Sequence, residues 1–147
     1  MKSSYFRENA IAFTIVCIAV LTACLAFLFL PEKIPMQWNG TNVIWYADRI
    51  AIFYLPITSA IVVIFLKPLI DSFFRNYLNL IPKLSGIIVS GIAFIFYSCE
   101  LYTIAFCSGV RLHIEYIVFP EFLFLAIFCF LYILKTKKTY RNNKVKN

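Results

Sequence analysis

The sequence predicts an all-α membrane protein of four transmembrane helices with both chain ends in the cytoplasm. Of its 147 residues, 62% are hydrophobic and 14% are charged, which is too little polar surface to cover a water-soluble globule of this size. Four apolar runs approach the roughly 20 helical residues that cross a hydrocarbon core about 30 Å thick. The distribution of Lys and Arg between these runs sets the predicted orientation.

The apolar runs are taken in chain order as one transmembrane domain followed by a basic cytoplasmic tail. The four predicted spans and the tail cover residues 10–30, 48–66, 84–107, 116–134 and 135–147. The second span is the shortest and contains Pro56, so we expect it to kink. The third has no break over 24 residues, so we expect it to tilt or to project beyond the hydrocarbon core.

Basic residues predict which connections face inward. Eleven of the 14 Lys and Arg lie in the N-terminal segment, the connection between spans two and three, and the tail, whereas three lie in the other connections: Lys33, Arg49 and Arg111. Both termini are therefore predicted to be cytoplasmic in a multi-pass protein of the bacterial cell membrane. The lipid bilayer is the expected partner, and clustering of charge beside apolar runs argues against nucleic-acid binding.

The connection between spans two and three has its own helical pattern. In residues 69–81 the apolar side chains recur at helical spacing, whereas Asp71, Arg75, Asn76 and Asn79 fall elsewhere on the wheel. This pattern predicts an amphipathic interfacial helix that ends before Pro82. A polar turn with chance spacing is the alternative.

All five cysteines lie in apolar runs and none forms a Cys-x-x-Cys pair, so neither a metal site nor a disulfide framework is expected. Leu-Thr-Ala-Cys at residues 21–24 resembles the box where bacterial lipoprotein signals are cut and the cysteine is lipidated. The apolar run continues beyond Cys24 to full spanning length, which favours an uncleaved first span. Lipidation of Cys24 is the alternative.

Residues 31–46, PEKIPMQWNGTNVIWY, predict a short extracellular hairpin-like cap between spans one and two. Asn39-Gly40 between two strand-like arms is a strong signal for a two-residue turn, which would place Trp38 opposite Thr41. One face of that hairpin would collect the side chains of Ile34, Met36, Trp38, Thr41, Val43 and Trp45. The alternative is an irregular loop whose tryptophans belong to an aromatic belt.

The same stretch carries a family resemblance. The pattern Leu-Pro-x-x-Ile-Pro-x-x-Trp-Asn-Gly, with a basic residue nine positions after the glycine, resembles the N-terminal membrane domain of unknown function of the SdpI immunity-protein family. The positions that carry it, with the glutamine inside the pattern, are Leu30, Pro31, Ile34, Pro35, Gln37, Trp38, Asn39, Gly40 and Arg49. Many members carry His in place of Gln37, so a metal or proton role at that position is not carried over.

The resemblance implies a polytopic bacterial membrane protein, of a kind that sometimes protects a cell against a secreted toxic peptide. Longer members continue into a second membrane segment with its own Gly, Pro and Trp signature. Nothing like that signature follows Pro82, so the chain is expected to be a short form that lacks the second half.

Two carboxylates interrupt the apolar spans. Counted at 1.5 Å per residue, Glu100 lies about 6 Å below the outer surface, and Glu121 is similarly shallow. The predicted site is an outer polar pocket that contains Glu100, Glu121, Arg111 and His113, with Arg49 nearby. The alternative is structural: Glu100 would pair with Arg111 or neighbouring backbone, and Glu121 would reach the headgroups.

Catalysis is the least supported class, because the chain has one histidine and no serine-hydrolase, zinc-protease or phosphate-loop motif. No cofactor is expected. The leading hypothesis is a non-catalytic protein that binds a secreted cationic or amphipathic peptide, toxic or signalling, at the outer face. The alternative is a small accessory or regulatory subunit of a larger membrane transport or signalling complex. The oligomeric state does not follow from the sequence.

Overall fold

The computed structural model describes residues 9–73 and 83–146 of the chain. Its elements, in chain order, are α2 (Ala10–Phe27), β1 (Lys33–Asn39), β2 (Asn42–Asp48), the 3₁₀ helix η1 (Arg49–Phe53), α3 (Tyr54–Phe73), α5 (Leu84–Cys107) and α6 (Glu115–Lys146). The described residues contain four helices that are long and apolar enough to cross a membrane, which confirms that part of the predicted fold class.

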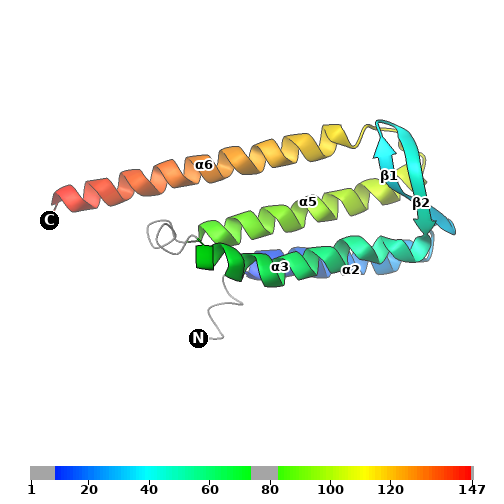
Figure 1. Cartoon of the computed structure of the whole chain (residues 1–147), viewed down its shortest axis with the longest axis horizontal. Helices are drawn as coiled ribbons and strands as arrows, with labels where there is room; N and C mark the ends of the chain where they lie inside the picture. The colour runs from blue at the N-terminus through cyan, green and yellow to red at the C-terminus, as the bar shows by residue number, and fades with distance from the viewer. Residues whose placement is uncertain (1–8, 74–82, 147) are drawn as a thin grey trace.

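Three of the helices lie side by side, and the fourth, α6, stands apart from α2 and α3 (Figure 1). Contacts join α2, α3 and α5 pairwise, whereas α6 contacts chiefly α5. The two strands lie across one end of the helices, and α2 begins and α6 ends at the opposite end. We call the former the hairpin end and the latter the far end.

The strands form an antiparallel hairpin in which Asn39 pairs with Asn42. The two-residue loop is therefore Gly40-Thr41, so the predicted Asn39-Gly40 turn is wrong by one residue. The physical reason is in the backbone: Gly40 has φ +61°, and no other residue of this loop has a positive φ. A turn with glycine at its first central position is of type II′ and spares Asn39 the left-handed conformation.

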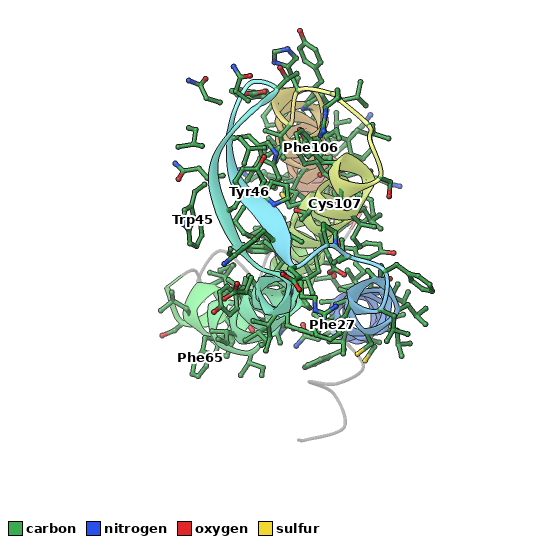
Figure 2. The ribbon with its side chains drawn as sticks, turned by 90° about the vertical axis from the view of Figure 1, so that its right-hand side faces the viewer. Phe27, Trp45, Tyr46, Phe65, Phe106 and Cys107 are labelled. Atoms are coloured by element: carbon green, nitrogen blue, oxygen red, sulfur yellow. The ribbon has the colours of Figure 1, made fainter. Side chains whose placement is uncertain are left out.

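The register differs from the predicted one because the ladder is irregular. Trp38 pairs with Val43 and not with the predicted Thr41. Because Val43 is two positions after Thr41, the side chains of Trp38, Thr41 and Val43 still share a face, as predicted. A register shift between Gln37 and Trp38 then places Trp45 opposite Gln37. Trp45 is 53% exposed and lies on the side of the hairpin that faces away from α5, so its predicted place on the face of Trp38 is wrong (Figure 2).

Small side chains allow α2 to approach its neighbours closely. Every buried side chain of α2 is alanine or valine, at spacings of three or four residues: Ala12, Val16, Ala19, Ala23 and Ala26. Such small-residue stripes let membrane helices pack at short range.

The stripe on α2 contributes to two apolar clusters at different levels. The hairpin-end cluster comprises Ala23, Ala26, Leu30, Ile34, Ala51 and Ile52. The far-end cluster comprises Ala12, Val16, Val63, Val89 and Ala93. Because Ile34 belongs to β1 and to the first of these clusters, the hairpin is anchored in the same core as the helices.

The second span differs from its prediction at both ends. Pro56 lies in the first turn of α3, where its missing N–H interrupts no helical hydrogen bond. The helix also continues through Pro68 to Phe73, so the expected interfacial segment begins within α3. The rest of that segment, residues 74–82, lies outside the described residues.

Helix α6 is the least covered of the four long helices. None of residues 115–138 is buried, and large apolar side chains such as Phe119 and Phe124 are more than two-thirds exposed. Its contact with α5 includes a close approach of Leu125 to Gly91, where an added Cβ would meet three side-chain carbons of Leu125. The absence of a side chain at Gly91 therefore sets the distance between α5 and α6.

Replacing Gly91 by alanine should destabilise the folded protein by about 1–3 kcal/mol, the usual cost of overpacking. The free energy of unfolding in mixed detergent micelles measures this loss. In the double variant Gly91→Ala/Leu125→Ala the added methyl group gains room, so the combined loss should be smaller than the sum of the single losses. Strictly additive losses would contradict the contact.

Candidate functional site

Trp38 fixes the hairpin on the end of α5. Its ring lies 5.1 Å from the Tyr102 ring and 6.1 Å from the Phe106 ring, both in edge-to-face arrangements. The Tyr102 hydroxyl donates a hydrogen bond of 2.6 Å to the carbonyl of Leu112, in the connection to α6. This aromatic cluster joins β1, α5 and that connection.

A pocket of about 310 Å³ lies between the hairpin and the helix ends. We call it the hairpin pocket, and its lining residues are Met36, Gln37, Trp38, Leu55, Cys99, Thr103 and Ile114. They come from β1, α3, α5 and the residue before α6, and most of the wall is apolar. The Thr103 hydroxyl donates back to the Cys99 carbonyl at 3.0 Å, which is a bond within α5.

Two buried polar groups in this part of the molecule, one of them on a lining residue of the pocket, have no hydrogen-bond partner among the described residues. One is the indole Nε1 of Trp38, which is buried. The other is Oε2 of Glu121, also buried, in the second turn of α6. The Glu121 carboxylate is close enough to the lining residue Cys99 to act on it electrostatically. The pocket lining therefore includes Trp38, which carries an unused buried donor, whereas Glu121, which carries an unused buried acceptor, lies outside the lining.

Glu100 lies elsewhere. Its side chain is fully buried and does not line the hairpin pocket. Neither carboxylate oxygen has a hydrogen-bond partner among the described residues, so pairing with Arg111 or with neighbouring backbone is also not what the structure shows.

The basic residues of the predicted outer pocket have other contacts. Arg111 donates from Nη1 to the carbonyl of Phe106 at 3.1 Å, and its guanidinium lies 4.0 Å from the Phe106 ring centre. His113 Nδ1 is 3.7 Å from Oε2 of Glu115. Arg49 lies over the Phe27 ring at 4.8 Å. None of the residues of the predicted outer pocket lines the hairpin pocket, although Glu121 acts electrostatically on the lining residue Cys99.

The residues of the family-like motif divide into anchors and exposed positions. Leu30, Ile34 and Pro35 are buried, with the first two in the hairpin-end cluster. The turn residue Gly40 lies against His113, because an added Cβ would be 3.1 Å from two atoms of its ring. In contrast, Pro31, Gln37, Asn39 and Arg49 are exposed. Much of the motif thus serves to attach the hairpin.

Several residues that line the pocket were not predicted from the sequence. Cys99 and Thr103 are four apart and share a face of α5, which periodicity alone could have paired. Leu55 and Ile114 carried no signal, because their place in the pocket depends on how α3 and the α5–α6 connection meet the hairpin.

The fold defines a helical membrane protein with a hairpin at one end of its helices and a pocket of about 310 Å³ beside that hairpin. The chain is 26% identical over 114 residues to the immunity protein SdpI of Bacillus subtilis (strain 168), a match that covers 76% of this chain and 53% of SdpI. The chain thus spans about half the length of the curated relative it matches. This similarity confirms the resemblance carried by the motif and supports a membrane location. No protein-family model matches the chain, and no solved structure matches it significantly.

The Gly40–His113 contact yields a prediction with a matched control. Gly40→Ala should destabilise the protein by roughly 1–2 kcal/mol through its positive φ, with an additional loss from contact with His113. Adding His113→Ala to Gly40→Ala should recover only the part of the lost stability that comes from the contact. Gly109 has φ +99° and nothing within 4 Å of an added Cβ, so the loss caused by Gly109→Ala should not change with His113→Ala. Free energies of unfolding measure all four variants, and equal rescue at both glycines would contradict the contact.

Proposed function

We propose that this chain is a non-catalytic, SdpI-like membrane protein that binds a toxic or signal peptide at the outer face of the bacterial cell membrane. The observation that carries the proposal is the hairpin pocket, whose wall is mostly apolar and includes Trp38 with its unpartnered indole. The unpartnered Glu121 carboxylate lies outside the lining, and in this proposal it turns toward the bound peptide. Its similarity to an immunity protein supports a protective role.

The distribution of charge supports placing the hairpin end outside. The far end carries Lys67 and, beyond the apolar part of α6, Lys135, Lys137 and Lys138. Among the described residues, the hairpin end carries Lys33, Arg49 and Arg111. A cytoplasmic far end satisfies the preference for basic residues on that side. It also places the exposed Trp45 of the hairpin at the outer membrane–water interface, where tryptophan is enriched.

The chemistry of the pocket favours a peptide with both apolar and cationic groups. The apolar wall can receive an aliphatic or aromatic side chain. The Glu121 carboxylate favours a lysine or arginine side chain, because charge complementarity in partly dehydrated surroundings stabilises the complex. The Trp38 indole can donate to a peptide carbonyl. A peptide held in this way at the membrane surface is kept from inserting.

One observation favours the alternative of an accessory subunit. Residues 115–138 of α6 have no buried side chain, and α6 contacts chiefly α5. A larger membrane protein could cover this face, as lipid also can. Co-purification of the tagged chain with a transport or signalling protein, lost on polar substitution along α6, would support that alternative.

Peptide binding is measured on the full chain in lipid nanodiscs. The probe is a fluorescent amphipathic lysine-rich peptide, compared with the same peptide carrying glutamate for lysine. We expect the lysine peptide to bind more tightly, and Glu121→Gln to weaken its binding about 10- to 100-fold, as expected for loss of a charge-assisted hydrogen bond of about 1.5–3 kcal/mol.

The control for Glu121→Gln is Glu115→Gln, which removes an exposed carboxylate of the same helix. Trp38→Phe should weaken binding through loss of the indole donor, whereas Trp45→Phe on the outward side should not. Cells that produce the wild-type chain should survive the lysine peptide better than cells that produce Glu121→Gln. Equal binding by both glutamine variants would contradict the proposed site.

A further inference from the structure

Glu100 and Ser59 are two fully buried polar side chains that the proposed pocket does not use. Glu100 is 0% exposed and Ser59 is 1% exposed. Both carboxylate oxygens of Glu100 and the hydroxyl of Ser59 lack hydrogen-bond partners among the described residues. Each therefore carries hydrogen-bonding capacity that the surrounding side chains do not satisfy.

Both residues lie between the two apolar clusters of the three-helix core. On α5, Glu100 falls between Ala93 of the far-end cluster and Ile104, which packs against the hairpin-end cluster. Along η1 and α3, Ser59 lies between Ile52 of the hairpin-end cluster and Val63 of the far-end cluster.

Ala19 of α2 also lies between the two clusters, after Val16 and before Ala23, and is 1% exposed. We call the region between the clusters, which contains Ala19, Ser59 and Glu100, the middle layer. Apolar clusters lie on both sides of it, so Glu100 is enclosed along the bundle axis as well as around it.

No described basic side chain compensates a charge on Glu100. Lys67, the basic residue of α3, pairs with Asp71 at 2.8 Å near the far end. Arg111 bonds to the Phe106 carbonyl at the other end of α5. The ionisable groups of α2 are the exposed Cys17 and Cys24.

The ionisable groups nearest to Glu100 along α5 have contacts of their own. Tyr97 shares a hydrogen bond of 3.4 Å with Thr22 of α2. Tyr102 donates to the Leu112 carbonyl, and Cys99 lines the hairpin pocket close to Glu121 of α6. None of these groups supplies a positive charge.

We propose that Glu100 is a proton-binding site in the core: it holds a proton for as long as α2, α3 and α5 are packed around it. An ionised carboxylate without a partner is strongly disfavoured in such surroundings, and the group avoids this cost by remaining neutral. Loss of the proton leaves an uncompensated charge in the middle layer, so the helices must part or admit water. Proton release is thereby linked to opening of the bundle.

The first test uses dicyclohexylcarbodiimide, an apolar reagent that forms a stable adduct with protonated carboxyl groups. The full wild-type chain in liposomes is treated at neutral pH, and the modified residue is located by mass spectrometry of its peptides. We expect an adduct at Glu100 that persists in Glu121→Gln and diminishes as the pH is raised. Replacing choline by Na⁺ at constant pH and ionic strength should not reduce the modification of Glu100 by the reagent.

Two outcomes would overturn the proposal. One is a Glu100 adduct whose yield stays constant as the pH is raised. The other is protection of Glu100 by Na⁺, which would make the site one for a metal cation and not for a proton.

The second test measures folding against pH. Because the folded state binds one proton more than the unfolded state, the folding equilibrium constant of the wild type should fall with rising pH, by up to about tenfold per pH unit across the neutral range. Glu100→Gln keeps the shape of the side chain without the titrating proton, so its folding constant should be nearly independent of pH. Glu121→Gln should retain the wild-type slope. An equal slope in wild type and Glu100→Gln would overturn the proposal.

Discussion

The close approach of α2 to α3 and α5 is the constraint on which the rest of the structure depends. In lipid there is little hydrophobic force between helices, so association depends on short-range packing. The buried stripe of alanine and valine on α2 provides it, with Ala12, Ala19 and Ala23 each at most 1% exposed. Larger side chains at these positions would move the helices apart and open the layer that encloses Glu100.

The hairpin depends on that core in turn, because a two-stranded sheet alone is marginally stable. Ile34 enters the hairpin-end cluster, and Trp38 lies against Tyr102 and Phe106 at the end of α5. The exposed Lys33–Asp48 ion pair at the open end contributes little by comparison, as solvent-exposed pairs usually do. Packing of the hairpin on the helices thus creates the pocket, and the family-like motif largely records that attachment.

The sequence was sufficient for the four helices and for a hairpin near Gly40, because hydropathy, length and the Asn-Gly pair are local signals. It was insufficient for the register, since the shift that turns Trp45 outward arises from irregular pairing and not from alternation. Which side chains face the pocket depends on how each helix is rotated about its axis, and no local sequence pattern indicates that rotation. Glu100 and Glu121, which the sequence grouped by depth, lie in different surroundings. Ser59 gave no signal, because its burial depends on how α3 packs in the bundle.

The central claim is that the hairpin pocket opens at the outer surface of the cell. Cysteine labelling tests this directly in a chain whose five native cysteines are replaced by alanine, with a single cysteine placed at Asn42 of the hairpin or at Lys138 beyond the apolar part of α6. A membrane-impermeant maleimide should label the hairpin position in intact cells, and the Lys138 position only after the cells are permeabilised. Labelling of the hairpin only after permeabilisation would contradict the account.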